Sequence, residues 1–281
     1  MTERDEGPLS ASDPGGPLSG SDPRGSLSER SAVGSLSERS AVGSLSERSE
    51  SKGRDARRTG RLDVGVIGAG RVGPVLAAGL AGAGHRIVGV ATTSGRDRVE
   101  ALLGSAPILE LPELLARSDL VVLAIPAAEI APLVRGLAEA GHWRPGTLLA
   151  HTAAEFGVDV LAPAAERGAI PLAIHPAIVF TGTSLDLTRL REAVCAVTAP
   201  APVLPIAQAL VVELGAEPVV VAERDRPAYA EAIATATAFS ASIVGQSLEI
   251  LAGIGVEQPR DIVAPLIRST IEEALRTLPP A

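Results

Sequence analysis

Cysteine and lysine are nearly missing from this chain of 281 residues, and each scarcity excludes a type of chemistry. Cys195 is the single cysteine, so no disulfide can form within the chain and no cysteine cluster can bind a metal. Lys52 is the only lysine and lies outside the part that we expect to fold, which excludes a catalytic lysine there. The histidines have no metal-ligand spacing, and we therefore expect no metal site.

The chain also lacks an excess of basic residues and any long apolar run. Its net charge of −8 argues against nucleic acid or an anionic membrane surface as the main partner. An apolar stretch at 232–245 is too short and too rich in Ser and Thr to span a bilayer, and we predict a buried helix there. The N-terminus has no apolar core of a secretory signal. We therefore expect a soluble cytoplasmic protein.

The N-terminal part of the chain has a composition that does not predict a core. A nine-residue unit, in the form GSLSERSAV or close to it, repeats five times between Gly7 and Ser51. Each unit offers one leucine, which cannot bury enough apolar surface to offset the entropy lost on ordering the backbone. We predict a disordered repeat tail at residues 1–60.

Alternating strand and helix patterns begin at Arg61 and end near Ala222. Continuous apolar runs such as DLVVLAI are typical of parallel strands covered on both faces. We predict strands at 62–67, 86–92, 119–125, 147–151, 170–174, 193–198 and 217–222. We predict helices at 71–82, 97–103, 127–140, 157–167 and 204–214, then a long helix at 225–251 and another at 260–276.

These patterns predict an α/β fold class. A doubly wound, Rossmann-like parallel sheet should occupy 61–222, with a core at 61–180 and a two-strand extension. A smaller all-α domain, which we expect to be incomplete, should follow at 223–281.

The most informative motif joins the first predicted strand to the first helix and reads GAGRVG. Gly68 permits the sharp turn, Gly70 lets a pyrophosphate approach the backbone, and Gly73 lets the helix pack closely on the strand. The free N–H groups at the start of the helix favour phosphate. We therefore predict a dinucleotide site; the alternative is a turn with a structural role alone. Its residues are Gly68, Ala69, Gly70, Arg71, Val72 and Gly73.

The turn after the second predicted strand bears on the choice of cofactor. An NAD site usually places Asp or Glu there, on the ribose 2′-hydroxyl. This chain instead has Thr92, Thr93 and Ser94, with Arg96 and Arg98 just beyond. Hydroxyl groups and a guanidinium match a 2′-phosphate, so we predict NADP as the cofactor. The alternative is that these are ordinary turn and helix residues.

Four residues at strand ends and one on the long helix are further candidates, because ligands of an open α/β sheet bind beyond the carboxyl ends of its strands. Ile125 and Pro126 should line the nicotinamide side. His175 is the first candidate for the proton donor, because the ordinary pKa of histidine suits proton transfer near neutral pH. His151 and Tyr229, the only tyrosine, are the other candidates. A structural role is the alternative for each.

The order of the segments resembles a known bacterial group. The segments are GAGRVG, DLVVLAIPAAEI, LLAHTA, LAIHPAIVFTGTSLDL, ELGAEPVVVAERDRPAYAEA and a late GVEQPRDIVAPL. They resemble proteins that pair a Rossmann-like domain with a C-terminal domain of unassigned function, near ketopantoate reductase, pyrroline-5-carboxylate reductase, prephenate dehydrogenase and the F420-dependent NADP reductases. The resemblance covers 61–281. It implies an NAD(P)-binding oxidoreductase with a helical C-terminal domain that often builds a dimer.

Three features depart from the pattern of that group. Ala153 and Ala154 stand where the group usually has Ser-Gly, and Ala238 stands where it often has an asparagine. Related chains also continue beyond the position of Arg276. The last two departures favour an alternative function, a non-catalytic NADP-binding or regulatory protein that has lost part of its substrate site.

The sequence thus predicts an NADP-dependent oxidoreductase that transfers hydride to or from a small carbonyl or imine substrate. The expected partners are that small molecule and a second copy of the chain, because the helix 225–251 has a surface too apolar to remain exposed. For the proton, a water relay through Thr152 or Thr181, or hydride exchange with an F420 cofactor, remains open.

Overall fold

The computed structural model of the chain describes residues 60–277. The predicted disordered tail at 1–60 therefore lies outside the described residues, except for Gly60. Residues 278–281 lie outside them as well.

One seven-stranded sheet forms the centre of the described part of the chain, in the order β2-β1-β3-β4-β5-β6-β7. The strands are β1 (Asp63–Ile67), β2 (Arg86–Ala91), β3 (Leu120–Leu123), β4 (Leu148–His151), β5 (Ile170–Pro176), β6 (Val194–Thr198) and β7 (Glu217–Val220). The first five strands run parallel, whereas β6 pairs antiparallel with β5 and β7 pairs parallel with β6.

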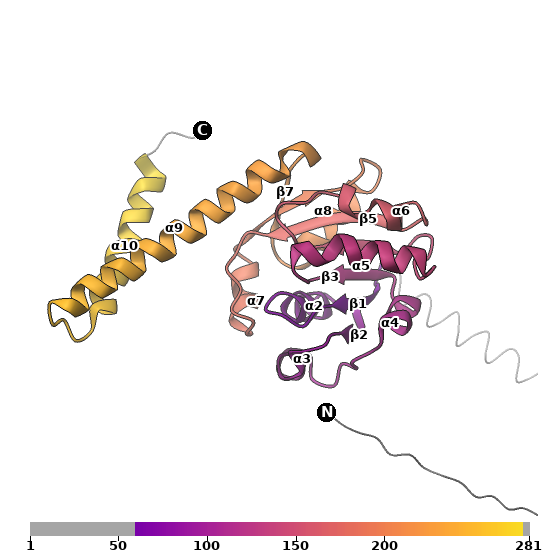
Figure 1. Cartoon of the computed structure of the whole chain (residues 1–281), viewed down its shortest axis with the longest axis horizontal. Coiled ribbons are helices and arrows are strands. Elements are labelled where there is room, and N and C mark those ends of the chain that lie inside the picture. Colours follow the sequence, from indigo (N-terminus) through magenta and orange to yellow (C-terminus); the bar gives the residue numbers. More distant parts are fainter. Residues whose placement is uncertain (1–59, 278–281) are drawn as a thin grey trace, which may run out of the picture. The chain divides into compact units, whose positions relative to one another are not determined.

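Helices cover both faces of this sheet, as the sequence predicted (Figure 1). One core cluster gathers the inner side chains of α2 (Gly73–Gly82), α3 (Arg96–Leu103), α7 (Leu185–Leu190) and α8 (Leu204–Glu213). The other gathers those of α4 (Leu111–Arg117), α5 (Ala127–Glu139), the 3-10 turn η1 (Asp159–Leu161) and α6 (Ala162–Ala165). The predicted α/β class with a Rossmann-like domain and a helical C-terminal domain is confirmed.

The direction of the last two strands differs from the fully parallel sheet that we predicted. Cys195, Ala196 and Val197 of β6 are each fully buried, because both faces of the strand are covered. An apolar run of this kind indicates burial on two faces but carries no information on strand direction. Helices α4 and α7 also have no counterpart among the predicted helices.

The C-terminal helices are α9 (Arg226–Gly253) and α10 (Pro259–Thr277), which follow a 3-10 turn, η2 (Glu223–Asp225), and pack against each other. The prediction of a buried helix at 232–245 is wrong for the single chain, since Arg226 is the only buried residue of α9 among the described residues. An alternation of Ala, Ser and Thr around larger apolar residues allows close packing, but the packing partner need not belong to the same chain. None of the described helices is long and apolar enough to cross a membrane.

Candidate functional site

In the turn between β1 and α2, the fold requires glycine at two positions but not at a third. Gly68 has φ +106°, and a Cβ there would lie 2.4 Å from the carbonyl oxygen of Ala124. A Cβ on Gly73 would lie 2.1 Å from the carbonyl oxygen of Gly68. Around Gly70, by contrast, no atom of the described residues lies within 4 Å of such a Cβ. Packing explains Gly68 and Gly73, and the open space at Gly70 fits the approach of a ligand.

A cleft of about 600 Å³ opens at the carboxyl ends of β1, β2 and β3. Nine of the predicted cofactor-binding residues line it, namely Gly68, Ala69, Gly70, Thr92, Thr93, Ser94, Arg96, Ile125 and Pro126. Glu110 and Glu129 line it too, and the sequence pattern did not point to either. The cleft fits a nucleotide in size and position.

A second cavity of about 280 Å³ lies on the other side of the same turn. It is lined by Arg71, Val72, Thr152, His175, Pro176, Ile178 and Phe180. Residues of GAGRVG therefore border both spaces: Gly68, Ala69 and Gly70 line the cleft, and Arg71 and Val72 line the cavity. An extended dinucleotide held across α2's first turn would place one end in each.

The two arginines of α3 have different surroundings. The Arg98 guanidinium donates a hydrogen bond of 2.6 Å to the carbonyl oxygen of Ala69, and its stem lies against Gly182. Arg96 is exposed and lines the cleft. The hydroxyl of Thr92 donates to the carbonyl oxygen of Ser94 at 2.5 Å, so it shapes the turn. Arg96 is therefore the arginine whose charge is available to a ligand.

His175 and Tyr229 come together although 54 residues separate them in the chain. Nδ1 of His175 lies 2.8 Å from the hydroxyl of Tyr229, and the rings meet edge to face with centroids 5.5 Å apart. Burial, followed by the charge of Arg226 and the proximity of His151, lowers the pKa of His175 to about 4. Burial raises the pKa of Tyr229. At neutral pH both side chains are therefore uncharged.

Arg226, in the first turn of α9, is the functional candidate that sequence reasoning missed. It is fully buried; Nε donates to Thr198 Oγ1 at 2.7 Å, and Nη2 donates to the carbonyl oxygens of Ala173 at 3.0 Å and Ala196 at 3.2 Å. Its guanidinium carbon lies 5.8 Å from the centroid of the Tyr229 ring. Nη1 has no hydrogen-bond partner within the described part of the chain. These bonds anchor the start of α9 on β5 and β6.

His151 differs from His175 in its burial and in its hydrogen-bond partners. It is fully buried, Nε2 lies 2.6 Å from the carbonyl oxygen of Gly157, and Nδ1 accepts the backbone N–H of Ala153 at 3.2 Å. Burial lowers its pKa to about 4, with the charge of Arg226 contributing. Because backbone groups occupy both ring nitrogens, this position favours the structural alternative for His151 over proton transfer.

A second anchor holds the start of α9, through the turn after β4. The carboxylate of Glu223 accepts the backbone N–H groups of Val158 at 2.7 Å and Asp159 at 3.2 Å. It lies so close to Gly157 that a Cβ there would be 2.0 Å from it. Glu223 and Arg226 together hold the helix that carries Tyr229, and they determine where its hydroxyl lies.

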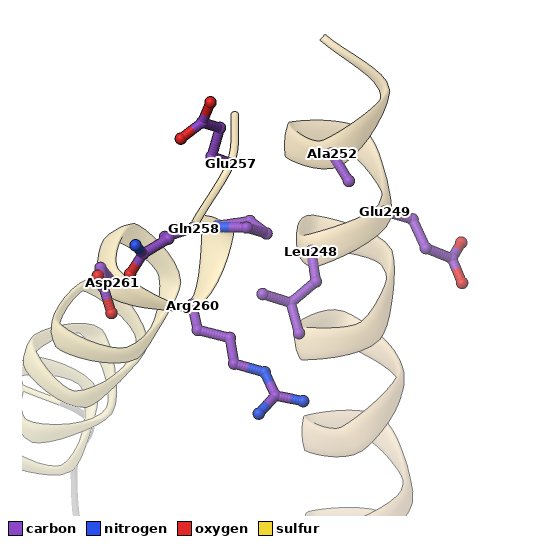
Figure 2. A pocket seen from close by; sticks show the side chains of 8 residues that line it. Leu248, Glu249, Ala252, Glu257, Gln258, Arg260 and Asp261 are labelled. Carbon is purple, nitrogen blue, oxygen red and sulfur yellow. The ribbon is translucent and has the colours of Figure 1, made fainter. Parts of the chain in front are cut away.

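A third cavity, of about 540 Å³, lies where α9 ends and α10 begins (Figure 2). Leu248 and Ala252 of α9 face the start of α10 across it, whereas Glu249 points away. No residue predicted for the site lies there. Among residues 60–277 there is also no group of three or more His, Cys, Asp or Glu side chains placed to hold a metal.

The sheet topology, the glycine turn and the two cavities define a Rossmann-like nucleotide-binding architecture. Residues 47–176 match the family model of a Rossmann-like domain. Residues 193–281 match the model described as a domain of unknown function, DUF2520. The chain thus carries a Rossmann-like domain followed by a DUF2520 domain, which confirms the resemblance inferred from the sequence. A search of curated proteins gave no match.

Several solved structures of similar fold are described as oxidoreductases or reductases. A Bacteroides fragilis protein assigned as an NADP oxidoreductase is 21% identical, with TM-score 0.63 over 78% of this chain and 82% of its own. The pyrroline carboxylate reductase of Plasmodium falciparum, solved with NADP bound, is 12% identical, with TM-score 0.56 over 78% and 80%. A variant imine reductase of Myxococcus stipitatus, solved with NAD+, is 18% identical, with TM-score 0.55 over 77% and 76%. At these identities the likeness concerns the fold.

Proposed function

We propose that this protein is an NADP-dependent oxidoreductase that transfers hydride to or from a small carbonyl or imine compound. The observation that carries the proposal is the position of GAGRVG, which borders the cleft at Thr92–Arg96 and the cavity at His175. A nucleotide bound across this turn would have its reactive end beside the only His–Tyr pair of the described residues. The fold likeness to reductases solved with NADP and with NAD+ supports the class.

The cofactor would be held largely by backbone groups. The start of α2, with Pro74 in its first turn, offers N–H groups and the positive end of the helix dipole to a pyrophosphate. Arg96 is the cation available to a ribose 2′-phosphate, and we propose NADP rather than NAD on this basis. A reduced nicotinamide bound at the cavity end supplies the hydride.

The proton would come from the His175–Tyr229 pair rather than from an imidazolium. With its pKa raised, Tyr229 keeps its proton and donates it to Nδ1, so the ring proton of His175 lies on Nε2. Nε2 has no partner within the described residues, and His175 lines the cavity. As hydride reaches the substrate carbon, Nε2–H protonates its oxygen or nitrogen and Nδ1 takes the phenol proton. Arg226 stabilises the tyrosinate until water reprotonates it.

His151 has a positioning role in this proposal. Its two backbone bonds hold the turn at Ala153 and Gly157, which follows Thr152 of the cavity wall. Of the earlier alternatives, a water relay through Thr152 stays open because Thr152 lines the cavity, whereas a relay through Thr181 is less favoured. Thr181 is engaged with the buried carboxylate of Asp186, to which its hydroxyl donates at 2.9 Å.

Nucleotide titration and turnover on a panel of carbonyl and imine compounds test this function. We expect NADPH to bind more tightly than NADH, and kcat to stay level between pH 8 and pH 5.5, because His175 titrates near pH 4. An imidazolium donor would instead lose activity above about pH 6.5. His175→Gln should lower kcat roughly 10²–10⁴-fold with little change in NADPH affinity, and Tyr229→Phe should lower it as well. His142→Gln, a histidine outside both cavities, is the matched control.

Two outcomes would contradict the proposal in different ways. Binding of NADPH without turnover of any compound would favour the non-catalytic regulatory alternative. Unchanged turnover in both variants would favour a reaction that needs no side-chain acid, such as hydride exchange with an F420 cofactor.

We further propose that the protein forms a homodimer through α9 and α10. Large apolar side chains are exposed along both helices and directly after α9, namely Phe239, Ile243, Ile250, Ile254, Ile262, Leu266, Ile271 and Leu275. An apolar surface of this extent is uncommon on a monomer. A second copy of the chain has the same surface, so the two surfaces would cover each other in a symmetric dimer.

A further inference from the structure

Asp186, in the first turn of α7, is a fully buried carboxylate that the proposed reaction does not use. Its oxygens accept the backbone N–H groups of Thr181 at 2.7 Å and Gly182 at 2.8 Å, and the hydroxyl of Thr181 at 2.9 Å. Arg189 donates a fourth hydrogen bond at 3.2 Å. Burial raises the pKa of Asp186, but the four hydrogen bonds outweigh burial and hold the pKa below its usual range. Asp186 is therefore charged at neutral pH.

Three of these four bonds come from the loop between β5 and α7, residues 177–184. Ile178 and Phe180 of this β5–α7 loop line the cavity beside His175 and pack against the core cluster of α2. The carboxylate of Asp186 thus holds the loop that forms one wall of the cavity.

The same loop packs against the glycine-rich turn. Gly182 is buried and has φ +81°. A Cβ on Gly182 would lie 3.0 Å from Nε of Arg98 and 3.2 Å from Cα of Arg71. Arg71 belongs to GAGRVG, and Arg98 donates its hydrogen bond to Ala69 of the same motif. The hydrogen bond from Gly182 to Asp186 therefore holds the loop against the backbone of this motif.

A buried carboxylate is a costly group with which to shape a loop, because removing its charge from water is unfavourable. A neutral serine or asparagine side chain can bind loop backbone as well. Charge-assisted hydrogen bonds are about twice as strong as neutral ones, so a carboxylate holds the loop more firmly. A firm support matters most where backbone N–H groups must meet a ligand together, because ordering a mobile backbone on binding costs affinity.

We propose, on the basis of the function above, that Asp186 is a positioning residue for cofactor binding, which acts through the β5–α7 loop to hold the glycine-rich turn in place for the pyrophosphate. Asp186 itself touches neither cofactor nor substrate. The turn it supports would meet the part that NADPH and NADH have in common, whereas selection between them stays with Arg96.

Fluorescence titration of the full chain with both nucleotides tests this role. We expect Asp186→Asn to weaken NADPH and NADH binding by about tenfold each, while kcat at saturating NADPH falls much less. Gly182→Ala should act similarly from the other side of the contact, because its Cβ would press on Arg98 and Arg71. The double variant should lose much less than the product of the two fold-changes.

Glu213→Gln is the matched control for a lost carboxylate charge. Glu213 binds Arg61 and His85 next to the amino ends of β1 and β2, outside both cavities. This variant should lose stability and keep its nucleotide affinity. Urea unfolding of each variant separates a loss of stability from a loss of binding.

Amide hydrogen exchange on the nucleotide-free chain gives a readout that needs neither cofactor nor turnover. The amides of Gly68 and Leu76, at the two ends of the glycine-rich turn, are hydrogen-bonded to backbone carbonyls. We expect both to exchange faster in Asp186→Asn, and to exchange as in the unmodified chain in Glu213→Gln.

Unchanged affinity for both nucleotides in Asp186→Asn and Gly182→Ala would overturn the proposal and leave the oxidoreductase function standing. A loss confined to NADPH would overturn it too, since the effect would then lie at the 2′-phosphate. Failure of the unmodified chain to bind either nucleotide would refute the proposed function itself, and the role of Asp186 with it. If Asp186→Asn does not fold, Thr181→Val removes one hydroxyl bond and keeps the carboxylate, and it should show a smaller loss for both nucleotides.

Discussion

At the scale of the residue, two arginines that look equivalent in the sequence have separate roles. Arg98 is engaged with the carbonyl oxygen of Ala69 and supports the glycine-rich turn, whereas Arg96 faces the cleft. Cofactor selectivity and cofactor affinity should therefore respond to different substitutions.

We expect Arg96→Ala to weaken NADPH binding by about 1.5–3 kcal/mol, the usual scale of a charge-assisted contact, and to leave NADH binding almost unchanged. Arg98→Ala should weaken NADPH and NADH alike, because it removes a support of Ala69. Fluorescence titration with both nucleotides measures these values. Arg167→Ala, an exposed arginine outside both cavities, is the control. Equal losses of the two nucleotides in Arg96→Ala would contradict a 2′-phosphate contact.

The two histidines at strand ends make folding stability depend on pH. Burial lowers the pKa of His151 and of His175 from 6.5 to about 4 in the folded chain. The unfolded chain therefore binds more protons than the folded chain between pH 6.5 and pH 4, and stability falls as the pH falls through that window. We expect each histidine to cost about 2 kcal/mol between pH 7 and pH 5.

Urea unfolding at both pH values measures this dependence. Other acidic groups contribute to the total change, so the informative quantity is the difference between the unmodified chain and His175→Gln, which cannot titrate. The variant should lose less stability on acidification than the unmodified chain. The same loss in both would show that His175 titrates normally in the folded protein.

At the scale of the element, the start of α9 is the feature on which the site depends. Glu223 binds the turn before η1, and Arg226 binds β5 and β6. These bonds fix the first turn of α9, so the hydroxyl of Tyr229 lies next to His175. Charge-assisted hydrogen bonds are strong and directional. They can therefore fix the first turn of a helix even where the rest of the helix extends away from the sheet.

We expect Glu223→Gln to lower the free energy of unfolding by about 1–2 kcal/mol and to lower kcat, with NADPH affinity unchanged. Gly157→Ala should act similarly, because its Cβ would occupy the place of the Glu223 carboxylate. The double variant should lose much less than the sum of the two. Unfolding and single-turnover kinetics on the four chains measure the cycle. Glu139→Gln, an exposed carboxylate on α5, is the control, and strict additivity would contradict a shared anchor.

At the scale of the whole molecule, the exposed apolar surface of α9 and α10 is the basis of the proposed homodimer. We expect light scattering to give a dimer at micromolar concentration. Ile243→Glu should shift it toward monomer, because the side chain is 53% exposed in the single chain and would be buried in the dimer. Val212→Glu on α8, where the side chain is 60% exposed, serves as the control for added charge. A stable, non-aggregating monomer of the unmodified chain would refute the dimer.

Much of the fold could be predicted because its signals are local. Apolar runs of strand length, helix-length segments between them and GAGRVG at the first junction together predict an α/β sheet with a glycine-rich turn between its first strand and first helix, as observed. The long helix was also clear, with predicted limits of 225–251 against Arg226–Gly253. Strand direction beyond β5 was not predictable, because burial on both faces produces the same apolar run in either direction.

By itself, the sequence determined the fold class, the glycine turn and the absence of an intrachain disulfide, since these depend on residue type and short spacing. Only the tertiary structure decided which polar residues act together. It paired His175 with Tyr229, satisfied both nitrogens of His151 with backbone groups, and buried Arg226 while leaving Arg224 exposed two residues earlier. The physical reason is that a pKa or a hydrogen bond depends on neighbours brought from distant parts of the chain, and no local pattern records them.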